Sequence, residues 1–280
     1  MSISAKDVKA LRDQTGAGMM DCKKALTESA GDMEKAIEFL RKKGQKLSEK
    51  RADREANEGV VIALTSENGS NGVVIRLSCE TDFVAKNDDF VALTTKIANI
   101  ALTNLPADLE ALKALPFDGS ISIGEKAIEQ TGVIGEKIEL SQYGKLEAAA
   151  GAGQVVPYIH MGNRAGVIVS LNQSGPNIQE AGRNVAMQVA AMKPIAVDKD
   201  GIDSSIVAKE IEIGKEIARK EGKPEEMLER ISTGKLNKFF KEKTLLNQAY
   251  VKGNKESVSD YLQTIDSNLT VTDFVHISLG

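Results

Sequence analysis

The sequence predicts an α+β protein in which a three-helix module precedes two similar subdomains, each an antiparallel sheet with a helix. Three observations predict this class. Short amphipathic segments fill the N-terminal part, β-branched runs separated by turn residues occur twice further along, and a helical pattern follows each of those runs. The 280 residues leave room for two or three small units. We place them at residues 1–55, 56–145 and 146–280.

Three short helices are predicted within residues 1–43. Ser4 and Asp7 have the spacing of a capping box at the start of the first helix. The glycines of residues 15–18 (TGAG) separate this helix from the second, and Asp32 is placed to cap the third. A bundle this small has a thin core, so we expect it to work as a docking module. The charged residues that follow, 42–58, are typical of a linker or an exposed helix.

The first sheet is predicted from a hairpin pattern. Residues 60–65 form a β-branched strand, residues 68–72 (NGSNG) a turn, and residues 73–79 the returning strand. The alternation predicts one core-facing set of side chains on the returning strand, made of Val73, Ile75, Leu77 and Cys79. A helix is expected from about Asp88, with apolar residues at helical spacing.

The same plan recurs in the second half of the chain. Its strand, turn and returning strand are predicted, in order, at 155–159, 160–164 and 165–171. Asn177 and Glu180 give a capping signal for the following helix, which is expected to end before Pro194. The segments GVVIRL (72–77) and GVIVSL (166–171) occupy equivalent places, so we infer a weak internal repeat of one sheet-plus-helix plan.

A highly charged insertion at about residues 203–242 is predicted to interrupt the second unit. Gly222 and Pro224 are the expected punctuation between two helices, so the insertion should form an antiparallel helical hairpin. Ser257 and Asp260 then predict a short capped helix, and the alternation from Val271 onward predicts a terminal strand.

Composition and charge exclude several classes of function. The net charge is −4, whereas a general nucleic-acid binder clusters Lys and Arg on one surface. The charge is unevenly divided, since the first 54 residues hold 13 basic and 9 acidic side chains, a net charge of +4, against −8 in the remainder. The N-terminal residues are polar and no apolar run approaches the ~20 residues of a membrane span. We therefore expect a cytoplasmic protein without a membrane partner.

The motifs that would indicate a metal site or a nucleotide site are each incomplete. The chain has two Cys and two His, and none of them has zinc-site spacing. Residues 119–124 have the spacing of a phosphate-binding loop, but Glu125 stands where that loop needs Lys. The glycines at 151–153 lack the third glycine of a dinucleotide fingerprint. We expect no metal site and no cofactor, and an enzyme would have to depend on His160 or His276 alone.

Residues 81–84 (TDFV), between the first returning strand and its helix, are the main candidate site. From the pattern alone, Phe83 continues the strand alternation and would be a core residue. The alternative is an exposed apolar prong on a turn, because aromatic anchors dominate binding energy when they enter a partner's pocket. The same tetrapeptide recurs at 272–275 inside an alternating strand, where we expect a structural role.

Two further features also have plain structural explanations. His160, in a predicted turn, would commonly be a hydrogen-bonding surface residue. Met19 and Met20 could belong to the small core, although adjacent helical residues point in different directions, so at least one should be exposed.

Two long segments carry a resemblance to a known family. Residues 15–26 (TGAGMMDCKKAL) and 79–86 (CETDFVAK) closely resemble the two signature segments of the bacterial elongation factor Ts family, the guanine-nucleotide exchange factors of elongation factor Tu. The resemblance extends through four shorter segments: 134–136 (IGE), 158–160 (YIH), 190–194 (AAMKP) and 222–224 (GKP). It therefore covers essentially the whole chain.

This resemblance implies a fold and an activity. The fold has an N-terminal three-helix module of ubiquitin-associated type, a core of two similar α+β subdomains and an inserted helical coiled coil. The activity is release of GDP from elongation factor Tu, without covalent chemistry and without a cofactor. The implied partner is GDP-bound elongation factor Tu, with no direct contact to nucleic acid. A homodimer or a dimer of heterodimers through the helical hairpin stays open.

The resemblance also implies site residues. The segment of Thr81, Asp82, Phe83 and Val84 presses near the magnesium site of the partner and dislodges the ion indirectly, so these residues are not metal ligands. Docking to the partner is implied for a second set: Arg12, Met19, Met20, Lys23, Ile134, Gly135 and His160. A rival function from another class is an adaptor that binds proteins through the three-helix module and has no exchange activity. Residues 81–84 discriminate the two functions, because a plain adaptor does not need them.

Overall fold

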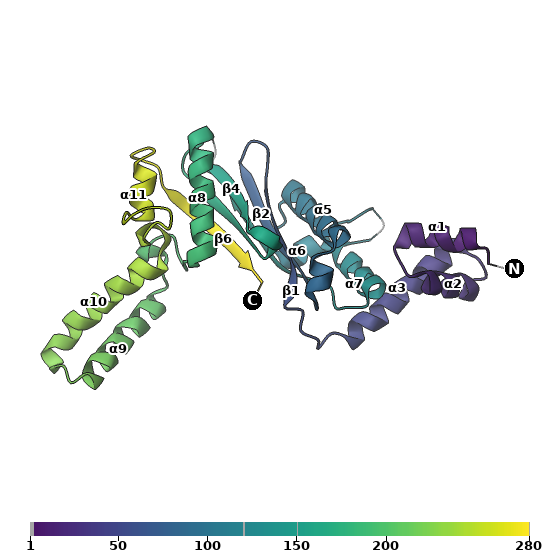
Figure 1. Cartoon of the computed structure of the whole chain (residues 1–280), viewed down its shortest axis with the longest axis horizontal. Helices are drawn as coiled ribbons and strands as arrows, with labels where there is room; N and C mark the ends of the chain where they lie inside the picture. Colours follow the sequence, from purple (N-terminus) through teal and green to yellow (C-terminus); the bar gives the residue numbers. More distant parts are fainter. Residues whose placement is uncertain (1–2, 120, 150, 280) are drawn as a thin grey trace.

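The computed structural model describes residues 3–119, 121–149 and 151–279 and has the predicted α+β architecture. The molecule is elongated (Figure 1), with the N-terminal helices at one end, two small sheets in the middle and a helical hairpin at the other end. Within the described ranges, no helix is both long and apolar enough to cross a membrane.

The N-terminal module consists of α1 (Ala5–Thr15), α2 (Met19–Glu28) and α3 (Met33–Lys50). The predicted Ser4 capping box is present in both directions, and the Asp32 side chain accepts from the backbone of α3 as expected. The small core that joins the three helices contains Leu11, Cys22, Ala25, Leu26 and Ala36. The charged residues 42–58 are not a linker throughout, because α3 continues into this segment and ends at Lys50.

Helix α3 continues because it gains a tertiary partner. It crosses α7 (Ile123–Ile134) at two glycines, where a Cβ on Gly132 would lie 2.7 Å from the Cα of Gly44. Two side chains at this crossing would hold the helix backbones apart. The module therefore packs directly on the first sheet unit through the last turns of α3.

The first sheet is antiparallel with the order β1-β2-β3, formed by β1 (Glu58–Thr65), β2 (Asn71–Cys79) and β3 (Glu139–Glu147). The core-facing set predicted on β2 is confirmed, since all four side chains pack with Phe90 and Ile97 of α5 (Asp88–Asn104). Helices α6 (Leu109–Ala114) and α7 complete this unit. The sequence pattern predicts neither of these two helices nor β3.

The second sheet repeats this plan with the order β4-β5-β6, formed by β4 (Gln154–Ile159), β5 (Ala165–Leu171) and β6 (Val271–Ser278). Helix α8 (Pro176–Met192) covers its outer face. Residues 72–77 and 166–171 both lie in middle strands, so their inferred equivalence is confirmed. The predicted Asn177 cap is wrong, because Gly175 is the N-cap and Pro176, whose fixed φ suits a first turn, begins the helix.

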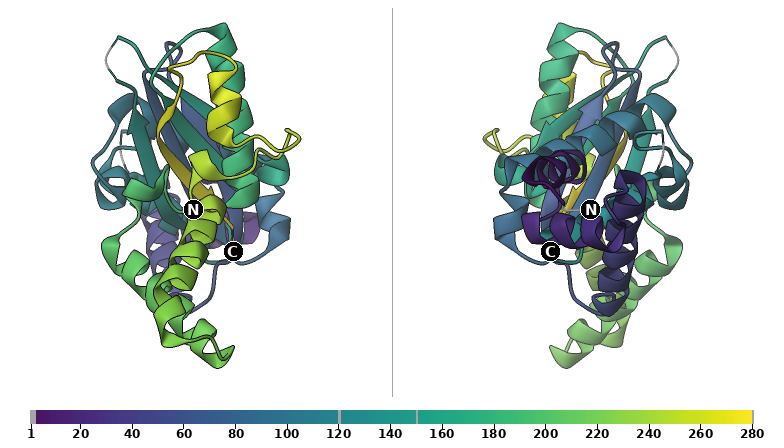
Figure 2. Two further views of the ribbon diagram at one scale, coloured as in Figure 1. Left: turned by 90° about the vertical axis from the view of Figure 1, so that its left-hand side faces the viewer. Right: turned by 90° about the vertical axis from the view of Figure 1, so that its right-hand side faces the viewer.

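The insertion is the predicted helical hairpin, formed by α9 (Ser204–Lys220) and α10 (Glu225–Lys243), which projects from the second sheet unit (Figure 2). Gly222, at φ 74°, makes the turn between the helices. The short helix α11 (Val258–Gln263) has the predicted capping box from Ser257. The remaining short 3₁₀ turns are η1 (Met161–Asn163), η2 (Lys199–Gly201) and η3 (Leu245–Asn247).

The two sheets pack face to face through a core of their own. Its buried members are Val61, Ala63, Val74, Leu146, Val155, Ile168, Ile277 and Leu279. Glycines of the middle strands allow a close approach, because a Cβ on Gly72 would lie 2.5 Å from Cγ1 of Val155 and a Cβ on Gly166 would lie 2.8 Å from Cγ1 of Val61. Both distances are too short for a real contact, so neither site has space for a side chain.

We expect Gly166→Ala to lower the free energy of unfolding by about 1–3 kcal/mol, because the added methyl must push the sheets apart or force Val61 off its rotamer. Urea unfolding followed by circular dichroism measures the change. Gly234→Ala in α10 is the matched control, because no described atom lies within 4 Å of its added methyl and Ala favours a helix. An equal loss of stability in both variants would contradict a steric role for Gly166.

Candidate functional site

The most exposed aromatic side chain lies on the turn between β2 and α5. Residues Asp82–Ala85 form the one-turn helix α4, in which Phe83 is 84% exposed while Val84 packs against the core of the first sheet unit. The strand alternation ends at Cys79, and the helical turn then rotates Phe83 outward. The alternative that Phe83 is a core residue is therefore wrong, and a large apolar surface stands in solvent.

This turn is held at its base by a carboxylate from another element. The backbone N–H and hydroxyl of Thr81 donate to the two oxygens of Glu136, at 3.0 and 2.7 Å. Glu136 follows Gly135, the C-cap of α7, whose φ of 84° turns the chain toward the sheet. The structure thus brings Ile134 and Gly135 beside the turn. From the sequence, residue 136 is only the last residue of a resembling segment (IGE, 134–136), and no role is predicted for it.

Asp82 makes an exposed ion pair with Lys86, 2.6 Å away and one helical turn further on. The hydrogen bond from Lys86 lowers the pKa of the Asp82 carboxyl below its ordinary value, with a smaller opposing effect of burial. Pairs as exposed as this one contribute little to stability. Asp82 is therefore an ionised carboxylate that can exchange Lys86 for a group on a partner.

His160 lies on an exposed turn between β4 and β5. Its Nδ1 is 3.0 Å from the hydroxyl of Tyr158, the surface hydrogen bond that a structural role would require. The next residue, Met161, is 87% exposed, and Gly162 has a positive φ of 77°. The sequence pattern did not predict a role for Met161. Its exposure could have been inferred because it is a large apolar residue next to a glycine in a predicted turn, and turns are usually exposed to solvent.

The His160 turn lies at the same end of the sheets as α4. Arg164 at the end of this turn pairs with Glu58 at 3.0 Å, and Glu58 begins β1 opposite Cys79, the last residue of β2. Two exposed apolar side chains, Phe83 and Met161, therefore belong to turns that emerge from one edge of the packed sheets.

The predicted docking residues of the N-terminal module are all exposed. Arg12 is in the last turn of α1, and Met19, Met20 and Lys23 begin α2. The two methionines are 54% and 76% exposed, whereas Cys22 on the same helix is buried. This cluster lies at the end of the elongated molecule formed by α1 and α2 (Figure 1), whereas α4 follows β2 in the first sheet unit. The candidate residues thus form two separate surfaces.

The second copy of the TDFV tetrapeptide has the structural role expected of it. Residues 272–275 lie inside β6, where Phe274 packs against the core of the second sheet unit. A register shift between Ser170 and Leu171 accommodates an extra residue on β6, so Asp273 does not share a face with Val271. The strict alternation that the sequence predicts from Val271 onward is therefore interrupted at this point.

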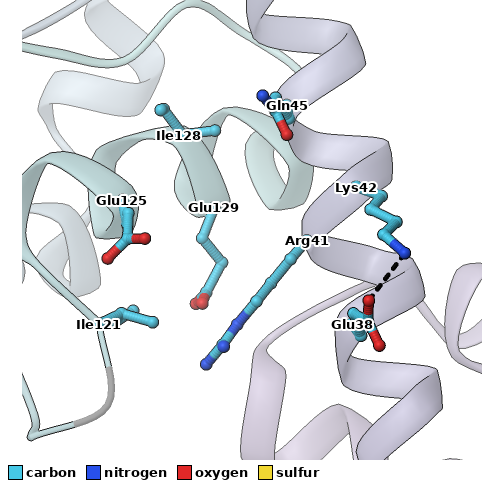
Figure 3. A pocket seen from close by; sticks show the side chains of 8 residues that line it. All are labelled: Glu38, Arg41, Lys42, Gln45, Ile121, Glu125, Ile128 and Glu129. Atoms are coloured by element: carbon cyan, nitrogen blue, oxygen red, sulfur yellow. Dashed lines mark ion pairs between the residues drawn. The ribbon is translucent and has the colours of Figure 1, made fainter.

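A pocket of about 260 Å³ opens between α3 and α7 (Figure 3). Its lining consists of Glu38, Arg41, Lys42, Gln45, Ile121, Glu125, Ile128 and Glu129. The charges of the two signs are interspersed, and Lys42 pairs with Glu38 at 2.7 Å. Throughout the described residues, no three His, Cys, Asp or Glu side chains are grouped so that they could hold a metal. This pocket marks the junction of the N-terminal module with the first sheet unit.

Comparison with known proteins decides the family. A family model described as Elongation factor TS matches residues 80–280. A curated Elongation factor Ts of Christiangramia forsetii is 52% identical over 278 residues, covering 99% of both chains. The Elongation factor Ts proteins of Cytophaga hutchinsonii and Porphyromonas gingivalis are 52% and 43% identical over 280 residues, covering 100% of this chain and 99% of each relative. The chain belongs to the elongation factor Ts family.

Membership in the elongation factor Ts family makes this chain a translation elongation factor of protein biosynthesis. The resemblance inferred from the two signature segments is thereby confirmed over the full length. Each signature combines buried residues with exposed ones, and the exposed apolar side chains are those of Met19 and Met20 at the start of α2 and of Phe83 in α4.

We expect Phe83→Ala to change the free energy of unfolding by less than about 0.5 kcal/mol, because the side chain is almost fully in solvent. Phe90→Ala, only seven residues away on α5, should cost about 3–5 kcal/mol because Phe90 is 97% buried, at 3% exposure. Thermal and urea unfolding of the two variants check this contrast. A large loss of stability in Phe83→Ala would show that Phe83 is part of the core.

Proposed function

We propose that this protein binds GDP-bound elongation factor Tu in the cytoplasm and promotes release of the GDP. The observation that carries the proposal is the exposure of Phe83 on a short helix whose base is fixed on both sides, in a chain of the elongation factor Ts family. A monomeric protein gains nothing from a solvated phenyl ring beside its core, whereas an aromatic anchor contributes strongly when a partner's pocket receives it.

Exchange of this kind requires no bond to be made or broken in either protein. A bound GDP is held largely through its phosphates and a Mg²⁺ ion that neutralises their charge. The ring of Phe83, inserted between elements of the partner near that ion, would shift the partner's Mg²⁺ ligands. Thr81, Asp82 and Val84 act with it, and none of them is a ligand of the ion. GDP then loses its counter-charge and dissociates faster.

The exposed surface of the N-terminal module serves docking, and the surface around α4 serves exchange. Arg12 and Lys23 offer positive charge beside the flexible side chains of Met19 and Met20, a combination suited to an adaptable contact. Ile134, Gly135 and His160 would dock close to α4. Docking at the distant module raises the effective concentration of Phe83 at its target. The coupling is reciprocal, so GDP must weaken binding of this protein by the same factor.

Phe83→Ala should slow the maximal rate of GDP release by about 30-fold, equivalent to the roughly 2 kcal/mol of an interface hot spot. Stopped-flow release of a fluorescent GDP analogue from a bacterial elongation factor Tu measures the rate. Phe274→Ala is the matched control, because it removes the same residue from the same tetrapeptide in β6. It should leave the rate per folded molecule unchanged.

If the wild-type protein does not accelerate release, or if Phe83→Ala releases GDP as fast as wild type, the proposed exchange role is wrong. Binding to elongation factor Tu without any acceleration would favour the adaptor alternative. Loss of exchange on replacing His160 or His276 by Ala, with binding retained, would instead point to a chemical role for histidine.

Met20→Ala should act on docking rather than on release. We expect the concentration for half-maximal exchange to rise about fivefold, because roughly 1 kcal/mol of apolar contact is lost, with the maximal rate within twofold of wild type. A titration of exchange rate against the concentration of this protein separates the two effects. A lower maximal rate with unchanged half-saturation would contradict the division of work between the surfaces.

A further inference from the structure

Two short segments hold each other through their carboxylates at the base of α4. Glu136 accepts the two hydrogen bonds from Thr81 described above, while Glu80 accepts one from the backbone N–H of Lys137, at 2.6 Å. Each segment thus supplies a carboxylate to the backbone of the other. We name residues 80, 81, 136 and 137 the carboxylate clamp.

The clamp is sheltered and charged. The Glu80 side chain is 17% exposed and also accepts from the guanidinium of Arg51, at 2.7 Å. Burial acts to raise the pKa of the Glu80 carboxyl, but the hydrogen bonds from Lys137 and Arg51 outweigh it, so the pKa lies below its ordinary value. Glu80 is therefore ionised at neutral pH, and hydrogen bonds to an ionised acceptor are the strong ones.

Helix α4 needs such a support. With four residues it is far shorter than a helix that is stable by itself in water. Thr81 occupies its N-cap position, yet the Thr81 side chain makes no bond to the helix, because its hydroxyl donates to Glu136. Val84 fixes one side of the turn on the core, and Glu136 fixes its start. Together they determine the direction in which Phe83 points.

We propose that Glu136 is a positioning residue for nucleotide exchange, holding the start of α4 so that Phe83 is presented in the orientation the partner receives. This inference rests on the proposed exchange function and goes beyond it, because it assigns the presentation of the ring to a residue whose carboxylate bonds to Thr81 and not to Phe83 itself. A ring already oriented loses little conformational freedom on binding, and that preorganisation serves the rate of exchange.

The clamp also connects the two surfaces. Arg51 is the C-cap of α3, and the ammonium of Lys137 donates to the carbonyls of Ala52 and Arg54, at 2.8 and 3.2 Å. The end of the docking module is therefore bonded to two of the four clamp residues, Glu80 and Lys137.

Glu136→Gln tests the proposal with little change of shape. A Gln side chain keeps one acceptor oxygen and places an NH2 in the position of the other, so the bond with the Thr81 hydroxyl must reverse its direction and both bonds lose the negative charge that strengthens them. We expect the maximal rate of GDP release to fall about tenfold, with half-saturation within twofold of wild type and an unchanged melting temperature. Glu129→Gln, which removes a half-buried carboxylate of α7, the helix that ends just before Glu136, is the matched control and should exchange like wild type.

A double-mutant cycle with Phe83→Ala distinguishes positioning from any other effect. If Glu136 acts by orienting Phe83, then Glu136→Gln has no further effect on the rate once Phe83 is Ala. Additive losses would overturn the proposal, as would a wild-type rate in Glu136→Gln. If Phe83→Ala alone leaves the rate unchanged, the exchange function itself fails, which is a separate result.

A second pair of variants keeps the test valid if Glu136→Gln unfolds. Thr81→Val removes the hydroxyl donor but keeps the shape of the side chain, and it should reproduce the loss of rate. Thr81→Ser keeps both the N–H and the hydroxyl donor, and it should exchange at the wild-type rate. Equal rates in Thr81→Val and Thr81→Ser would overturn the role of the clamp, whichever result Glu136→Gln gives.

Discussion

The close face-to-face packing of the two sheets is the constraint on which the rest of the structure depends. Three glycines permit it, because side chains at Gly72, Gly144 and Gly166 would overlap with valines of the opposite sheet. Protein interiors pack about as densely as crystals of small organic molecules, so this contact allows only one arrangement of the two sheets. It fixes the edge from which the α4 turn and the His160 turn both emerge. The positions of the apolar side chains on those two turns therefore depend on this packing.

A protein that acts by shape needs rigid support under exposed side chains. Phe83 and Met161 are the largest solvated apolar groups beside the sheets, and each is on a turn whose flanking residues are bonded to another element. Their exposure has no benefit for folding, since burying them would be favourable. The surrounding chain therefore maintains an unfavourable surface, which is what a site for a partner requires.

The sequence predicted those elements whose pattern is local. The middle strands β2 and β5 are runs of β-branched residues and were assigned correctly, as were the Ser4 and Ser257 capping boxes. Strand β3 was missed because only Leu140 and Leu146 in it are buried, so no alternation is visible. Helix α3 was assigned too short, since its last turns depend on α7 rather than on their own apolar pattern. The carboxylate clamp joins residues 55 positions apart, a distance at which local patterns carry no information.

The sequence by itself determined the α+β class, the repeated plan, the helical hairpin and, through two long signature segments, the family. Those features follow from residue types at short spacing, which act before the chain is folded. Only the tertiary structure decided that Phe83 is exposed while Val84 beside it is buried. The strand alternation predicted that Phe83 is buried. Which of the two side chains is exposed depends on the residue at which the one-turn helix begins. That start is set by Glu136, a residue brought to Thr81 by the packing of α7 on the sheet.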